Sequence, residues 1–407
     1  MRVPTKSIAP VVVAAVVAAF PLQAAAEGPG LLVGESRLHL GLAVEGGYDN
    51  NVTFSSPAVA DAVLHIKPML KMDVPSEKVA FNLALTGDVT RYLSVSEDTS
   101  SYSTVQGTAS TSAVFNPKGR FNFSLRDDFT RSSEPRYDIA GTFARTHNSA
   151  GAAFDFRPGG GALSVGLGYS FVFDFFDEGT GLSGGDSYSH QPSFDVRWKF
   201  FPKTSFVLSA SGDLKRYPNT QETLGVTYQN TDMNAIRATV GLVGLVTPKL
   251  SVTLRAGYGN TMAVESASGD FASAIGMAEL GYDMTLQTRF SLGYSRDFQP
   301  ALLFGYVGVD KFYASARQGL FGRLSLQLNG AVALQAYGTP AVGQNLPAGN
   351  RNDVVITVGA GADYEILSWL SVGVADNYQK LSTSFTGAGV AAKYDKNVIG
   401  GYVKVMY

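Results

Sequence analysis

The residue types that could carry out chemistry are few in this chain and widely spaced. Its four histidines, His39, His65, His147 and His190, show no spacing typical of metal ligands, so no metal site is predicted. Cysteine is absent, which excludes disulfides, thiolate metal sites, a cysteine nucleophile and a lipid-modified cysteine. We expect no resident cofactor.

Serine close to histidine is the one arrangement that could support hydrolysis. His190 lies near Ser193, and His147 lies near Ser149. However, serine is so common here that proximity along the chain means little. The glycines at 159–161 precede a strand pattern and not a helix, so they predict a hairpin turn in place of a phosphate-binding loop. No catalytic residue is predicted, and an enzyme is not expected.

Acidic clusters offer a second possibility. The runs Asp49-Asn50-Asn51 and Asp127-Asp128 could bind calcium or cations that bridge lipopolysaccharide, but solvated loop carboxylates are the favoured interpretation. Charged residues make up only 16% of the chain, against roughly 25% in a typical soluble domain. The formal net charge is -2 and there is no basic run, so nucleic acid is excluded as a partner.

Most of the remaining charges alternate with apolar residues. Leu250, Val252, Leu254 and Tyr258, for example, alternate with polar or small neighbours such as Arg255. Successive residues of a strand point to opposite faces, so such a run predicts one apolar and one polar face. The runs are at least 11 residues long, whereas soluble strands average about five or six and tilted membrane strands need roughly 9–11. The pattern therefore favours a transmembrane β-barrel over a soluble sandwich.

The polar faces of these runs would line the lumen of the barrel. The candidate lining residues are Arg126, Asp128, Asp195, Arg197, Lys199, Asp213, Lys215, Arg237, Arg255, Glu279, Asp283, Gln327, Asn329 and Gln335. Both signs of charge are present, so strong ion selectivity is not expected. Such groups could make weak, repeated hydrogen bonds to a passing solute, as conduction requires. An alternative of equal weight is that they merely solvate the lumen or pair across strands.

The N-terminus predicts a targeting segment. Arg2 and Lys6 precede an apolar core at 11–20, and an Ala-x-Ala sequence ends at Ala26, so cleavage is expected between Ala26 and Glu27. The apolar core is too short to span a bilayer. We expect residues 1–26 to be a signal peptide, 27–36 a short periplasmic segment and 37–407 the barrel.

Turn signals divide the barrel into eighteen strands, with sixteen as the alternative count. The expected strands are 37–49, 61–73, 78–92, 102–115, 120–130, 143–156, 161–175, 187–200, 204–217, 234–246, 250–260, 270–284, 287–299, 303–318, 323–337, 351–364, 369–380 and 390–407. The connections alternate between short turns and longer polar loops, and only the loop near 300 breaks this rule. Outer-membrane barrels have short periplasmic turns and long external loops. The fold class is therefore an all-β, antiparallel up-and-down transmembrane barrel in the cell outer membrane, with both chain ends in the periplasm.

The last strand ends in alternating apolar and aromatic residues. Tyr402, Val403, Val405 and Tyr407 are similar to the C-terminal signal by which bacterial outer-membrane barrels are recognised for assembly. The expected partners are accordingly the barrel assembly machinery, outer-membrane lipid and lipopolysaccharide.

One stretch resembles a known family. The sequence Gly46-Gly47-Tyr48-Asp49-Asn50-Asn51-Val52 is similar to the opening of a β-barrel porin family (porin-2-like) whose members often belong to exopolysaccharide export systems. The resemblance implies a passive conduit for polysaccharide cargo, with a periplasmic export factor as partner. It supplies no catalytic residues. The alternatives are a general diffusion porin for small hydrophilic solutes or, in a different class, an outer-membrane enzyme or a structural or adhesin barrel.

Overall fold

The fold is that of a computed structural model of the chain. The structure describes residues 27–95, 99–133, 143–177, 183–223, 226–228, 230–264, 270–302, 304–339, 351–383, 385 and 393–407. The expected signal peptide at 1–26 lies outside the described residues. None of the helices among them is long and apolar enough to cross a membrane.

Strands account for nearly all of the regular structure. The long strands are β2 (Ser36–Asp49), β3 (Asp61–Val74), β4 (Val79–Tyr92), β5 (Thr104–Phe115), β6 (Phe121–Ser132), β7 (Arg145–Phe156), β8 (Leu163–Phe176), β9 (Ser187–Phe201), β10 (Thr204–Arg216), β13 (Met233–Leu245), β14 (Leu250–Asn260), β15 (Ala272–Asp283), β16 (Thr288–Pro300), β17 (Tyr306–Leu320), β18 (Leu324–Tyr337), β19 (Asn352–Leu367), β20 (Leu370–Thr383) and β21 (Tyr394–Met406). The short elements are β1 (Leu31–Val33), β11 (Gln221–Thr223), β12 (Val226–Tyr228) and the 3-10 turns η1 (Ser100–Tyr102), η2 (Gly159–Gly161) and η3 (Ser183–Gly185).

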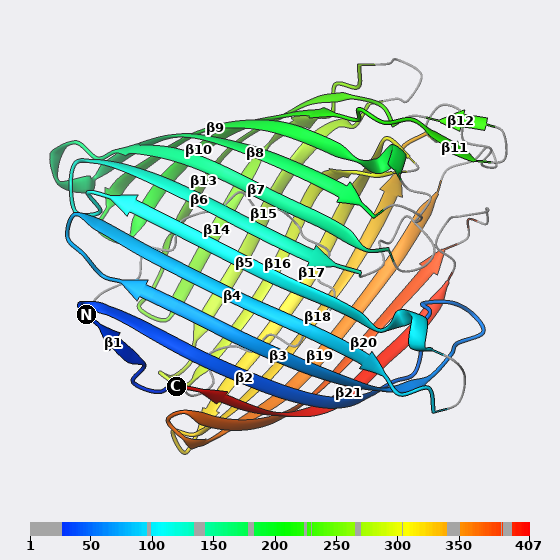
Figure 1. Cartoon of the computed structure of the whole chain (residues 1–407). Coiled ribbons are helices and arrows are strands. Elements are labelled where there is room, and N and C mark those ends of the chain that lie inside the picture. The colour runs from blue at the N-terminus through cyan, green and yellow to red at the C-terminus, as the bar shows by residue number, and fades with distance from the viewer. Residues whose placement is uncertain are drawn as a thin grey trace.

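The eighteen long strands close into a barrel (Figure 1). Each pairs antiparallel with its neighbours in the chain, and β2 closes the ring by pairing with β21 as well as with β3. The predicted fold class is confirmed, with eighteen strands and not sixteen. The sequence did not predict β1, which pairs with the start of β2, or the separate β11–β12 hairpin. Closure pairs both edges of the sheet, so the barrel itself leaves no open edge strand.

The two ends of the barrel differ in their connections. Both ends of the described chain, which begins at Glu27, lie at the end with short turns, such as the two residues between β9 and β10 (Figure 1). We call this the turn end and the opposite one the loop end. The 3-10 turn η2, where Gly159 and Gly161 have φ of 61° and 84°, forms one of the short turns. The glycines there form a tight turn before a strand, as predicted.

The two faces of each strand differ as the alternation requires. Leu254, Leu326 and Leu328 are exposed on the outer face, where a membrane barrel meets lipid. On the inner face, the Tyr402 ring lies against Gly373 and the Tyr313 ring against Gly293. An added methyl at Gly373 would come within 2.5 Å of the Tyr402 ring, so glycine is required for this close approach.

Candidate functional site: the channel wall and its mouth

The register places the fourteen predicted lining residues on one continuous face. Directly paired residues of neighbouring strands share a face. Arg255 pairs with Gly241 on β13 and Met277 on β15, whereas the exposed Leu254 pairs with Leu242 and belongs to the other face. Following the cross-strand pairs from strand to strand around the ring places all fourteen residues on the side opposite the exposed leucines. This side is the lumen side.

Several of these lining residues are held by ion pairs or by hydrogen bonds to neighbouring side chains. Arg126 Nε lies 2.9 Å from Asp128 Oδ2 on the same strand. Arg237 Nε lies 3.0 Å from Asp297 Oδ1, which belongs to β16. Glu279 accepts a hydrogen bond of 2.7 Å from the Tyr313 hydroxyl. Part of the lining is therefore self-paired, in agreement with the cross-strand alternative weighed from the sequence.

Asp174 is the centre of a charged cluster that the sequence did not indicate. Arg145 Nε lies 2.8 Å and His147 Nδ1 2.9 Å from Asp174 Oδ1, and Lys215 Nζ lies 3.7 Å from Oδ2. The carboxylate is buried. Three basic groups around one acid stabilise its charged form and give this part of the wall an excess of donors.

Two arginines of the same wall, Arg197 on β9 and Arg255 on β14, lack such close partners. Arg197 and Arg255 each have a buried Nε with no hydrogen-bond partner among the described residues. Between them in the cross-strand row lie Val207 and Gly241, which are too small to fill the space. Arg255 reaches only a long contact of 3.4 Å to Ser209 Oγ. This stretch of wall therefore carries two positive charges without a direct ion pair among the described residues, and Asp195 acts on Arg255 only at longer range.

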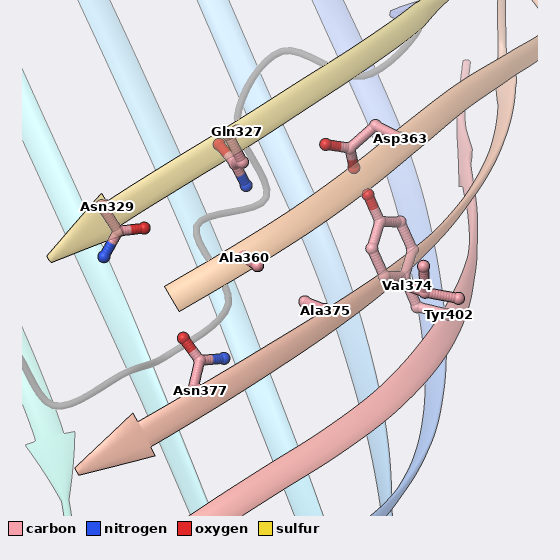
Figure 2. A pocket seen from close by; sticks show the side chains of 8 residues that line it. All are labelled: Gln327, Asn329, Ala360, Asp363, Val374, Ala375, Asn377 and Tyr402. Atoms are coloured by element: carbon pink, nitrogen blue, oxygen red, sulfur yellow. The ribbon is translucent and has the colours of Figure 1, made fainter. Parts of the chain in front are cut away.

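On the other side of the lumen, β18 to β21 form a polar pocket. Figure 2 shows Gln327, Asn329, Asp363, Asn377 and Tyr402 around it. The Tyr402 hydroxyl is buried without a hydrogen-bond partner in the described chain. Amide, hydroxyl and carboxylate groups here can exchange hydrogen bonds with a polar solute.

The mouth at the loop end is narrowed by an apolar cluster. Leu302 and Phe304, from the short β16–β17 connection, are buried with Phe176 of β8 and Tyr337 of β18. The β8 and β17 strands are seven steps apart around an eighteen-strand ring. A methyl added at Gly185 in η3 would lie 2.6 Å from Leu302 Cδ2. The β16–β17 connection therefore reaches across the mouth to the far wall.

A buried cation fixes this connection. Arg351 is fully buried and donates hydrogen bonds of 2.8 and 2.5 Å to Asp353 Oδ2. Its guanidinium lies 4.3 Å from the centre of the Tyr337 ring and 5.4 Å from that of Phe304. Phe304 also packs edge-on against Phe385, at 5.6 Å between ring centres. We call Leu302, Phe304, Tyr337 and Arg351 the mouth cluster.

The two acidic runs, at 49–51 and 127–128, are expected from the sequence to be solvated loop carboxylates, but the structure places them on strands or at strand ends. Asp49 is buried and forms an ion pair of 2.5 Å with Lys396, which also donates to the Asn51 carbonyl. The prediction of solvated loop carboxylates is therefore wrong for Asp49, because the ends of β2 and β21 meet there. Asp127 instead faces outward and accepts a hydrogen bond of 3.1 Å from Asn148 Nδ2.

The histidine–serine pairs do not form a hydrolytic arrangement in the described chain. His190 pairs with Leu214 and faces outward, whereas Ser193 pairs with Ser211 on the lumen side. His147 and Ser149 share a face, but the bond of His147 Nδ1 goes to Asp174. No group of three metal-ligating side chains occurs among the residues described.

The terminal residues singled out from the sequence lie at or near the turn end. Tyr402 faces the lumen, whereas Val403, Val405 and Tyr407 alternate to the outer side. Glu27 forms an ion pair with Lys71. Ala26 lies outside the described residues, and whether these groups act in assembly or cleavage stays a prediction.

Some functional residues were not found by sequence reasoning. The mouth cluster had one signal, since Ala301-Leu302-Leu303-Phe304 is apolar whereas the other loops are polar. The Asp174 cluster had none, because its members are far apart in sequence and meet only through strand register.

These features can be compared with known proteins. The family model described as "Putative beta-barrel porin 2" matches residues 26–407. The chain belongs to this family. No curated protein matches the sequence.

Solved structures show the same fold at low identity. A BenF-like porin from Pseudomonas fluorescens Pf-5 aligns with a TM-score of 0.53 and 8% identity, over 92% of this chain and 100% of that one. The outer membrane protein opdK from Pseudomonas aeruginosa gives 0.49 and 11%, over 91% and 99%. OccAB3 from Acinetobacter baumannii gives 0.49 and 12%, over 92% and 100%.

The family and fold identify this porin as an outer-membrane β-barrel channel. They point to a channel and not to an enzyme. The turn end is then the periplasmic one in the arrangement common to such barrels.

Proposed function

We propose that this porin is a passive diffusion channel for small hydrophilic solutes. The observation that carries the proposal is the mouth cluster, which brings the β16–β17 connection across the barrel to the opposite wall. An eighteen-strand barrel would otherwise leave a wide aqueous lumen. A solute must pass the space left beside these apolar side chains, so the geometry favours small molecules.

The lining supports the same proposal. It combines hydroxyl and amide groups with charges of both signs, many of them paired within the wall. Such a surface stays hydrated and holds no polar solute tightly, and conduction requires weak sites that release their cargo. The polysaccharide export favoured from the sequence becomes the second candidate, because a polymer would have to displace the mouth cluster continuously.

Liposome swelling tests the proposal. Purified porin reconstituted into liposomes should admit monosaccharides and amino acids quickly and tri- or tetrasaccharides slowly or not at all. Control liposomes with heat-denatured protein should admit neither. Equal rates for small sugars and long oligosaccharides, together with loss of surface polysaccharide from a deletion strain, would favour the export conduit instead.

A further inference from the structure

The lumen wall formed by β3 to β6 contains a hollow of about 240 Å³ near the turn end. Its polar lining combines both signs of charge with uncharged groups: Lys71, Asp73, Asn82, Ser112, Arg126 and Asp128. We call it the β3–β6 groove. It lies apart from the mouth cluster, on strands that the mouth cluster does not include.

One cross-strand row forms the main axis of the groove. Asp73, Asn82, Ser112 and Arg126 are direct partners on β3, β4, β5 and β6. Neighbouring strands lie about 4.8 Å apart, so the Cα atoms at the two ends of the row are about 14 Å apart. Asn82 Nδ2 lies 3.4 Å from Ser112 Oγ, and both side chains are short. The row therefore has two short polar side chains, Asn82 and Ser112, between the Asp73 carboxylate and the Arg126 guanidinium.

The parallel row has the opposite polarity, and its ends are already engaged. Lys71, Ala84, Ser110 and Asp128 are direct partners along it. Lys71 binds the Glu27 carboxylate, and Asp128 binds Arg126 Nε. Burial raises the pKa of Glu27, but the hydrogen bond and charge of Lys71 outweigh this and lower it, so the carboxylate stays ionised.

The charged groups at both ends of the main row still have hydrogen-bonding groups without partners among the described residues. Arg126 uses Nε for Asp128, and its two terminal nitrogens make no hydrogen bond to any described residue. These nitrogens present the fork that binds a carboxylate in two parallel hydrogen bonds. Asp73 has no ion pair or hydrogen bond from its side chain within the described chain. The Arg126 side chain is 42% exposed, so a solute in the lumen can reach it.

We propose that the β3–β6 groove is a binding subsite for extended zwitterions of dipeptide size, with the ammonium group at Asp73 and the carboxylate at Arg126. An extended dipeptide spans about 7 Å, and the two side chains cover the remaining distance. Its peptide group lies over Asn82 and Ser112, which can donate to it and accept from it. This assignment rests on the proposed function, since it names a solute class for the same channel.

Singly charged solutes fit the groove less well. An anion at Arg126 lies beside the carboxylate of Asp128 and leaves Asp73, at the other end of the row, without a partner. A cation at Asp73 lies beside Lys71. Only a ligand with both charges, at the separation of the row ends, satisfies both ends together, and this is the physical basis of the selectivity.

The test uses the full mature barrel with diglycine as the probe. N-acetyl-diglycine lacks the ammonium group and diglycine amide lacks the carboxylate, so these serve as matched ligands. In planar bilayers, diglycine should block the ion current at a concentration at least about tenfold lower than either analogue. Calorimetric titration of the detergent-solubilised barrel should give the same ranking without requiring conduction.

Amino-acid substitutions distinguish binding in the β3–β6 groove from a general effect of lumen charge on diglycine block. Arg126→Gln and Asp73→Asn should each raise the half-blocking concentration of diglycine about tenfold, whereas Arg317→Gln on β17 should leave it unchanged. The double exchange Asp73→Arg with Arg126→Asp should restore block, because the zwitterion can bind in reverse. Assembly of each variant is checked by heat-modifiable migration on gels.

The outcomes distinguish the two proposals. If the barrel admits sugars but the three ligands block and bind equally, the groove assignment is overturned and the proposed function stands. An effect of Arg317→Gln equal to that of Arg126→Gln would also overturn the assignment. If the barrel neither admits solutes nor binds diglycine, both proposals fail.

Discussion

Arg197 and Arg255 form no ion pair with any described acid, although Asp195 lies close enough to Arg255 to act on its charge. Several other lining residues are in ion pairs, as Arg126 is with Asp128 and Arg237 with Asp297. The identity of lumen-facing residues could be predicted from the sequence, because alternation alone fixes the face of each side chain. Which of them are paired could not be predicted, since pairing depends on the register between strands.

Neutralising Arg255 should therefore lower the preference of the channel for anions. A unit charge about 10 Å from a permeating ion contributes about 0.4 kcal/mol in water, which corresponds to about a twofold change in permeability ratio. We expect Arg255→Gln to lower the chloride-to-potassium ratio by about that factor, measured as the reversal potential across a salt gradient. Arg131→Gln, on the outer face beside Asp177, is the control and should change nothing. Equal shifts for both variants would mean that Arg255 does not face the permeation path.

Strands are the elements that the sequence predicts best. Observed bounds differ from the expected ones by no more than about four residues, because long alternating runs end at clear turn signals. The position of the β16–β17 connection could not be predicted from the sequence. Its shortness was evident, but its contact with η3 depends on the distance across the ring and not on any local pattern.

The phase of β14 predicts how two adjacent substitutions behave. Leu254→Arg places a charge against lipid and should cost about 2–4 kcal/mol of barrel stability if the site is near the bilayer midplane. Arg255→Leu changes the wet face and should leave assembly nearly intact. Urea unfolding in lipid vesicles, followed by tryptophan fluorescence, measures both. Similar losses would show that the strand phase is wrong.

The mouth cluster predicts a gain of conductance on removal. Replacing residues 301–304 by a Gly-Ser segment removes Leu302 and Phe304 from the mouth, and the narrowest section of a pore limits its current. Single-channel conductance should rise by about twofold or more. Substituting the exposed turn residue Phe321 by serine should not alter it. Unchanged conductance in the loop variant would show that the constriction lies elsewhere.

At the scale of the whole molecule, the alternation of short turns and long loops fits a closed barrel with an even number of strands. An even number of antiparallel strands brings both ends of the described chain to one side, and Figure 1 shows them together at the turn end. Apolar side chains are fully or almost fully exposed at the tips of turns there, such as Leu286 and Phe321. Ion pairs on the outer face, such as Arg296 with Asp310, lie toward the loop end. This asymmetry indicates that the hydrocarbon layer begins at the turns and that the strands extend beyond it at the loop end.

Sidedness is the property of the whole barrel that can be tested most directly. Because the loop end carries the long connections and projects from the hydrocarbon layer, it should face the cell exterior. An epitope tag inserted near residue 225 should be tolerated and should bind antibody on intact cells. A tag between Pro202 and Lys203, in the two-residue turn after β9, should bind only after the outer membrane is permeabilised. Both tagged proteins must first show heat-modifiable migration, which reports an assembled barrel. The reverse labelling pattern would place the mouth cluster in the periplasm, and solutes entering the cell would then meet the β3–β6 groove before the constriction.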